Sequence, residues 1–147
     1  MKVSECMSPD VDTVTSDQPI REAAQFMLRG DTGALPVCDG GKLSGMVTDR
    51  DITVRGVAEG RGPDTPVRDV MTDDILFIYD DQDVEDAAML MSDRQVRRLP
   101  VKSRENDSLV GIVSLADVSR SDQGEAASVA LDGITDPGGE HNQSTES

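Results

Sequence analysis

The sequence predicts an α+β protein made of two copies of one β-α-β-β-α unit. Three observations lead to this prediction: the chain repeats itself, each repeat carries an amphipathic helical stripe, and short stretches of β-branched and aromatic residues surround that stripe. A strand-helix-strand order places helices against one face of a mixed sheet. At 147 residues, the chain is long enough to bury a core of Val, Ile, Leu, Met and Ala.

The internal repeat is seen when the chain is offset against itself. The tripeptide LPV occurs at residues 35–37 and again 64 residues later, at 99–101. Beyond it the offset grows to 66 residues, so that Gly45 corresponds to Gly111. A turn of different length in each copy explains the change. Such self-similarity indicates a repeated structural unit.

These offsets set the expected domain boundaries. We expect the first repeat at residues 3–60, a linker rich in turn-forming Gly and Pro at 61–66, and the second repeat at 67–122. Beyond the repeats, apolar residues within 123–134 predict a short extra helix. Residues 135–147 lack Lys and Arg and predict a flexible acidic tail.

Each repeat has the same expected order of elements. A short strand at residues 10–15, or 74–79 in the second copy, precedes a helix. The helices are predicted by apolar residues at i, i+3, i+4 and i+7, namely Ile20, Ala23, Ala24 and Met27, then Val84, Ala87, Ala88 and Met91. Two strands follow, ALPVCD and LSGMVT in the first copy, RLPVKS and LVGIVS in the second. Another helix then begins at Thr48 and at Ser114.

Composition excludes several classes of partner and chemistry. The net charge of −15 repels phosphate, which argues against nucleic acid and against an anionic membrane surface. The sequence shows neither a signal-peptide core nor an apolar run near the length of a membrane span, and so predicts a cytoplasmic protein. Cys6 and Cys38 lack CxxC spacing, and the sequence favours two reduced thiols, with Cys38 a buried or half-buried apolar residue rather than a reactive one; a Cys6–Cys38 bond stays open. His141 stands alone, so no metal site is expected.

One short pattern occurs in both repeats, as GMVTDRD and GIVSLAD, and it has two interpretations. In the structural one, Thr48 with Asp51, and Ser114 with Asp117, form capping boxes at a strand-to-helix junction. In the functional one, the helix N–H groups and the hydroxyl bind phosphate, and the carboxylate accepts both hydroxyls of a ribose. The two interpretations are compatible.

The ordered set of motifs resembles a tandem cystathionine-β-synthase (CBS) domain pair that stands alone. The matching stretches cover about residues 3–122 and read CMSPDVDTVTSDQPIREAAQFM, GALPVCD, LSGMVTDRDI, VMTDD, DVEDAAMLM, QVRRLPV and LVGIVSLADV. The set is most similar to the small two-repeat proteins typified by mycobacterial hypoxic response protein. The resemblance implies two repeats packed sheet to sheet about a pseudo-twofold axis, and a homodimer.

The same resemblance implies an adenine nucleotide bound in the clefts between the repeats. The ligand would be AMP, ADP, ATP or a relative such as NAD or S-adenosylmethionine, with accompanying Mg²⁺ left open. Asp51 and Asp117 would hold ribose hydroxyls, and Thr48 and Ser114 would touch ribose or phosphate. Adenine would be covered by residues and backbone around Val14 with Val37, and Ile78 with Val101, while Arg97 and Arg98 would face phosphate.

The expected function is therefore regulatory and not enzymatic. A nucleotide-sensing module would change conformation on binding and signal to a separate protein partner. The alternative is a ligand-free structural or protein-interaction pair made under stress, in which Asp51 and Asp117 serve only as helix caps.

Overall fold

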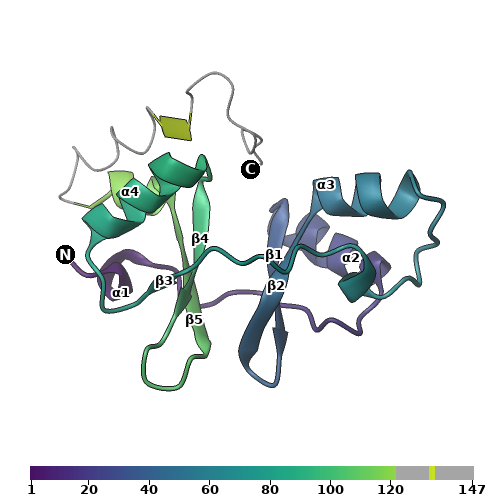
Figure 1. Cartoon of the computed structure of the whole chain (residues 1–147), viewed down its shortest axis with the longest axis horizontal. Helices are drawn as coiled ribbons and strands as arrows, with labels where there is room; N and C mark the ends of the chain where they lie inside the picture. Colours follow the sequence, from purple (N-terminus) through teal and green to yellow (C-terminus); the bar gives the residue numbers. More distant parts are fainter. Residues whose placement is uncertain (122–132, 135–147) are drawn as a thin grey trace. The chain divides into compact units, whose positions relative to one another are not determined.

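The computed structural model describes residues 1–121 and 133–134, and it confirms the α+β class (Figure 1). Its elements run in the order α1 (Val3–Cys6), α2 (Ile20–Gly30), β1 (Ala34–Asp39), β2 (Lys42–Thr48), α3 (Asp49–Asp51), η1 (Ile52–Val57), η2 (Val67–Asp69), β3 (Ile78–Tyr79), α4 (Val84–Arg94), β4 (Arg98–Lys102), β5 (Leu109–Ser114) and α5 (Leu115–Ser119). Apart from Gly133 and Ile134, the expected helix at 123–134 and the tail at 135–147 lie outside the described residues.

The chain forms two compact units. The repeat-one unit contains residues 12–75, and the repeat-two unit contains residues 1–11 with the second repeat from Leu76 onward. The compact units therefore divide the chain differently from the sequence repeats. In each case the segment that precedes a repeat in the sequence packs in the other unit.

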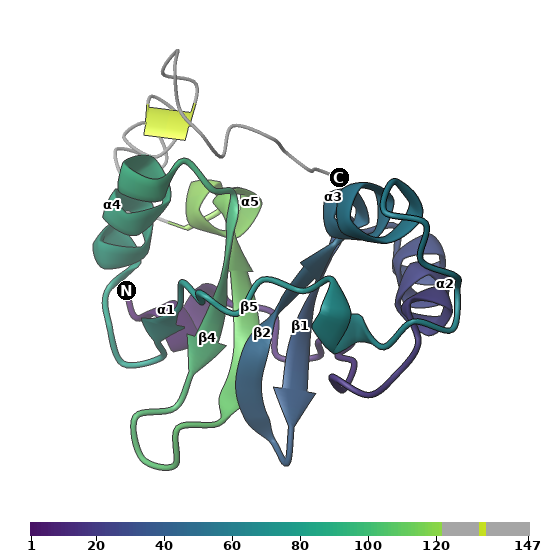
Figure 2. The same cartoon turned by 45° about the vertical axis from the view of Figure 1, so that its right-hand side comes forward.

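The repeat-one unit is a hairpin of β1 and β2 with α2 and the helix formed by α3 and η1 on one side of it (Figures 1 and 2). Gly40 and Gly41 make the turn with φ of +62° and +81°, a conformation that favours glycine. The expected strand at residues 10–15 is reduced to a single parallel bridge between Val14 and Val37. η1 is a π-helix that brings Gly56 against Ile20.

The repeat-two unit has a three-stranded sheet in the order β3-β4-β5, with β3 parallel and β5 antiparallel to β4. Its core contains Ile78, Met91 and Leu99, all at most 2% exposed. The turn between β4 and β5 is longer than the two-glycine turn of the first copy, as the change of offset predicts. The β-α-β-β-α order therefore holds in this unit in full.

The two helical stripes are buried to different extents. Val84, Ala87, Ala88 and Met91 are all buried on α4, as predicted. On α2, Ile20, Ala23 and Met27 are buried, but Ala24 is exposed. The copies thus differ on the helix face that carries Ala24 in one unit and Ala88 in the other.

The segment that precedes each repeat lies against a strand of the unit in which it packs. This contact explains why the repeated pattern begins with glycine, at Gly45 and at Gly111. Ser8 and Ile112 exchange backbone hydrogen bonds of 2.8 and 3.0 Å beside Gly111, and Met46 and Thr72 do so at 2.9 and 2.8 Å beside Gly45. A Cβ on Gly45 would lie 2.6 Å from the Thr72 carbonyl oxygen, and one on Gly111 would lie 2.7 Å from Met7 Sδ. Glycine is required at both positions because another segment lies against the strand.

Candidate functional site

In the repeat-one unit, the repeated pattern forms the predicted capping box at the junction of β2 and α3. The Asp51 N–H donates to Thr48 Oγ1 at 3.0 Å, and the Thr48 N–H donates to Asp51 Oδ2 at 3.0 Å. Thr48 has extended backbone and ends the strand, so its hydroxyl faces the first turn of the helix. The structural interpretation of the pattern is confirmed here.

The repeat-two unit builds the same cap at the junction of β5 and α5. The Asp117 N–H donates to Ser114 Oγ at 3.1 Å, and the Ser114 N–H donates to Asp117 Oδ2 at 2.8 Å. One contact differs between the copies, because the Arg120 guanidinium pairs with Asp117 Oδ1. The sequence analysis missed this ion pair, although the i, i+3 spacing of Asp117 and Arg120 is a signal for it.

Both cap carboxylates are buried. Their Oδ1 atoms differ, because Asp117 Oδ1 has a donor and Asp51 Oδ1 has none among the described residues. Asp51 is 9% exposed and Asp117 is 5% exposed. Burial raises the pKa of the Asp51 carboxyl, against the lowering effects of its hydrogen bonds with Thr48 and of the nearby Arg55 and Arg50. Within residues 1–121 and 133–134, no donor contacts Asp51 Oδ1. This oxygen can therefore accept a hydroxyl of a ligand.

The four residues expected beside adenine lie in the cores of their units. Val14 and Val37 are 1% and 0% exposed, and Ile78 and Val101 are 2% and 0% exposed. They pair through the backbone, Val14 with Val37 by a bridge and Ile78 with Val101 in the β3–β4 ladder. Their side chains support the strands, so a ligand would meet the backbone of these positions. Their assignment to adenine remains a prediction.

The two arginines expected beside phosphate lie at the start of β4. The Arg97 carbonyl accepts a hydrogen bond of 2.8 Å from the N–H of Leu115, the first residue of α5. Arg97 is exposed, and no carboxylate of the described residues forms an ion pair with its guanidinium. Arg98 is half-buried. The backbone of Arg97 is therefore bonded to the first residue of the helix that carries Asp117.

The corresponding position of the repeat-one unit has the opposite charge. The Gly33 carbonyl accepts from the Asp49 N–H at 2.9 Å, which reproduces the contact of Arg97 with Leu115. A Cβ on Gly33 would lie 3.0 Å from an Asp49 carboxylate oxygen. The Asp49 carboxylate therefore lies beside the place of a side chain at position 33, which corresponds to Arg97 in the second copy. The repeat-one site is less favourable for phosphate.

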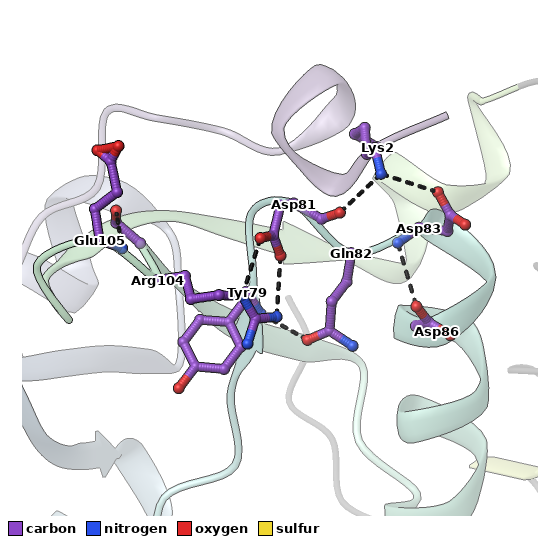
Figure 3. Close-up of polar contacts among 9 residues, drawn as sticks. Lys2, Tyr79, Asp81, Gln82, Asp83, Asp86, Arg104 and Glu105 are labelled. Carbon is purple, nitrogen blue, oxygen red and sulfur yellow. Dashed lines mark hydrogen bonds and ion pairs between the residues drawn. The ribbon is translucent and has the colours of Figure 1, made fainter.

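An aromatic and a cationic side chain pack together at β3, where Arg104 lies over the ring of Tyr79 (Figure 3). The Arg104 guanidinium lies 4.0 Å from the centre of the Tyr79 ring and donates to both oxygens of Asp81, at 2.9 and 3.1 Å. The Tyr79 ring meets Phe77 edge-on at 5.2 Å, and Lys102 Nζ lies 4.2 Å from the centre of the Phe77 ring. The two rings belong to the residues on either side of Ile78 in the sequence.

Three further features of the described residues concern metal ligands, thiols and membrane-spanning helices. Among them, no group of three or more His, Cys, Asp or Glu could hold a metal ion. Burial raises the pKa of the Cys6 thiol, with the charges of Asp117 and Glu5 adding to it, and burial also raises the pKa of Cys38. Both cysteines are free and half-buried, and for Cys38 this agrees with the expected burial. No helix in the described part of the chain is long and apolar enough to cross a membrane.

The chain is a tandem of two such units, each with a strand-to-helix cap, and comparison with known proteins identifies its family. The family model described as CBS domain matches residues 3–55 and 67–124. The chain belongs to the CBS-domain family. It is 42% identical over 134 residues to the CBS domain-containing protein YhcV of Bacillus subtilis, covering 90% of this chain and 94% of the relative.

The chain is also similar in sequence and in structure to a hypoxic response protein. Hypoxic response protein 1 of Mycobacterium tuberculosis is 39% identical over 116 residues, covering 78% of this chain and 80% of the relative. A crystal structure of that type with two coordinated zinc ions matches with a TM-score of 0.75 and 36% identity, covering 82% of this chain and 98% of the other. The predicted likeness to this type is confirmed.

Solved CBS structures with adenosyl ligands are also similar. CBSX2 in complex with AMP matches with a TM-score of 0.72 and 28% identity, over 81% of this chain and 93% of the other. The CBS domain pair of MJ0100, in complex with 5′-methylthioadenosine and S-adenosyl-L-methionine, matches with a TM-score of 0.71 and 28% identity, over 85% and 98%. Some CBS pairs of this fold therefore bind adenosyl ligands.

Proposed function

We propose that this chain is a non-enzymatic, cytoplasmic sensor of an adenine nucleotide or a related adenosyl ligand. The observation that carries the proposal is the Asp51 carboxylate, which is 9% exposed and closes the helix cap with Oδ2 while Oδ1 faces no donor among the described residues. A buried carboxylate oxygen without a donor suits a ribose hydroxyl, since hydrogen bonds to charged groups are strong.

Each unit would supply residues that bind ribose, and the repeat-two unit would also supply cations for a phosphate. Thr48 and Asp51 would bind ribose in the repeat-one unit. Ser114 and Asp117 would do so in the repeat-two unit, after the Arg120 side chain moves from Asp117 Oδ1. Arg97 and Arg98 make the repeat-two site the better place for a phosphate, because Asp49 opposes an anion in the first copy.

The mechanism would be a population shift. A ligand that binds one conformation better than another moves the equilibrium by its difference in affinity, and the changed surface is presented to a separate protein partner. We also propose a homodimer, in keeping with the resemblance on which the family was first recognised. Sedimentation equilibrium of the full chain tests this directly, because a monomeric mass at micromolar concentration contradicts it.

One alternative is favoured by a specific observation. The two capping boxes are complete without any ligand, so Asp51 and Asp117 already have a structural role. A ligand-free pair that acts by protein contacts under stress, as the name of the mycobacterial relative suggests, would need nothing more from these residues.

Thermal unfolding of the full chain separates the two functions. We expect one or more of AMP, ADP, ATP, NAD and S-adenosylmethionine to raise the midpoint, because a ligand at a hundredfold excess over its Kd adds about 2.7 kcal/mol to the folded state. The panel is repeated with Mg²⁺, which separates a requirement for the metal from binding of the nucleotide alone. No shift with any compound at millimolar concentration would favour the ligand-free alternative.

A further inference from the structure

Gly133 and Ile134, here called the C-terminal strap, contact the repeat-two unit far from their place in the sequence. Ile134 is 2% exposed and belongs to the same core cluster as Met91 and Val118. The Gln95 side-chain amide donates a hydrogen bond of 2.8 Å to the Gly133 carbonyl. Figures 1 and 2 show this short segment, coloured at the yellow-green end of the scale, beside α4. The strap thus completes the core with one apolar side chain and one polar contact.

The contact is sterically specific on both sides. A Cβ on Gly133 would lie 2.0 Å from Ser92 Oγ and 2.5 Å from Ser92 Cα, so the strap requires glycine and α4 requires a small residue. At the corresponding position of the first copy, 64 residues earlier, stands Leu28, which is 83% exposed. A leucine on α4 would occupy the space of the strap. The strap is therefore specific to the second repeat.

A short chain of contacts joins the strap to the candidate site. Gln95 ends α4 in the left-handed conformation, with φ of 56°. Two residues later, Arg97 accepts the hydrogen bond from Leu115 at the start of α5, next to the Ser114–Asp117 cap. Ile134 shares its core cluster with Val118 on the same helix. The strap is therefore bonded to the end of α4 through Gln95 and shares a hydrophobic core with the helix that carries Asp117.

We propose that Gln95, Gly133 and Ile134 are positioning residues for the repeat-two site. While the strap is docked, it fixes the segment from Gln95 to Arg98 relative to α5, and so fixes the cation at Arg97 relative to the carboxylate of Asp117. Loss of the strap loosens that spacing and weakens nucleotide binding without removing any group that touches the ligand. This inference rests on the proposed function.

Two substitutions in the full chain displace the strap from opposite sides. Ser92→Leu places the residue of the first copy on α4 and retains helix propensity, whereas Gly133→Ala introduces the excluded Cβ on the strap. Gln95→Glu is a milder third variant, because it replaces the donor that faces the Gly133 carbonyl with an acceptor. Gln25→Leu, on an exposed position of α2, and Gly62→Ala, where nothing lies within 4 Å of the added Cβ, are matched controls.

Binding and stability are measured on the same samples. Calorimetric titration with AMP, ATP and S-adenosylmethionine at 25 °C gives the dissociation constants, and thermal unfolding without nucleotide gives the midpoint. We expect the three strap variants to bind the preferred compound about three- to tenfold more weakly, which lies within the range of coupling through residues that do not touch a ligand. The two controls should bind as the wild-type chain does.

The outcomes distinguish the strap from the proposed function. Strap variants with lower midpoints but unchanged dissociation constants would mean that the strap serves stability alone, which overturns the positioning role. Unchanged midpoints together with unchanged binding would overturn the docked strap itself. A wild-type chain that binds none of the three compounds would overturn the proposed function and the positioning role together. If Ser92→Leu or Gly133→Ala fails to fold, Gln95→Glu gives the decisive comparison.

Discussion

Gly45→Val is expected to lower the free energy of unfolding by about 3 kcal/mol, the upper part of the range for overpacked sites. The added Cβ would lie 2.6 Å from the backbone oxygen of Thr72 and 3.2 Å from Met71 Sδ. A backbone oxygen cannot turn aside as a flexible side chain can. The segment must therefore leave β2, and the two hydrogen bonds between Met46 and Thr72, of 2.9 and 2.8 Å, are lost. Urea unfolding followed by circular dichroism measures the effect.

Gly62→Val is the matched control for this substitution. An added Cβ at Gly62 meets nothing within 4 Å, and its backbone is not in the left-handed region. Substitutions at such sites change stability by no more than about 0.5 kcal/mol. Equal unfolding of the Gly45 and Gly62 variants would show that residues 71 and 72 do not lie against β2 in solution, and the described pairing would then be wrong.

The local elements follow from local patterns, which is why the sequence predicts them. The stripe that begins at Ile20 gives α2, the two glycines after Asp39 give the tight hairpin, and the hydroxyl–acid spacing of Thr48 and Asp51 gives the cap. Each of these depends on residues within one helical turn or one hairpin. The expected contacts of the caps with a nucleotide come from the family resemblance, because the periodicity of the sequence gives no information about a ligand.

The contacts that the sequence does not predict join segments far apart in the chain. The residues around Gly111 do not indicate that Met7 and Ser8 pack against it. A bridge of a single residue pair, such as that of Ser8 with Ile112, produces no periodic pattern in the sequence. The docking of Ile134 on the second repeat is not predicted either, because apolar residues at helical spacing within 123–134 do not indicate which core they join. The first strand of repeat one is predicted at six residues but holds one bridge, because Val14 is flanked by polar residues.

Asp51→Asn is expected to weaken nucleotide binding about tenfold to hundredfold while the helix cap remains. The asparagine Oδ1 can still accept the hydrogen bond from the Thr48 N–H, which now comes from Asp51 Oδ2 at 3.0 Å. The amide nitrogen then takes the place of Oδ1 and presents donors where the ribose needs an acceptor. The loss corresponds to about 1.5–3 kcal/mol, the usual contribution of a hydrogen bond to a charged group. Calorimetric titration measures it.

Asp51→Ala provides the contrast, because it removes the Asp51 half of the capping box together with the ligand contact. This variant is expected to lose about 1 kcal/mol of stability without nucleotide, because the Thr48 N–H loses its hydrogen bond with the Asp51 carboxylate. Asp51→Asn should not. If the asparagine variant bound nucleotide as tightly as the wild-type chain, Asp51 would be a cap and nothing more, whatever the effect of alanine.

The pH dependence of unfolding checks the physical premise of this argument without any ligand. Burial raises the pKa of Asp51 above its unfolded-state value of about 3.9, so the folded chain holds this proton more tightly. The stabilising contribution of Asp51 is then fully present below the unfolded-state pKa and is lost as the pH rises through the higher folded-state pKa. Asparagine does not titrate. Between the unfolded-state and folded-state pKa of Asp51, the stability of Asp51→Asn relative to the wild-type chain should rise with pH, and above that range it should become constant. A stability difference that does not change with pH would mean that the Asp51 carboxylate is solvated. Its Oδ1 would then not be a buried acceptor for a ribose hydroxyl.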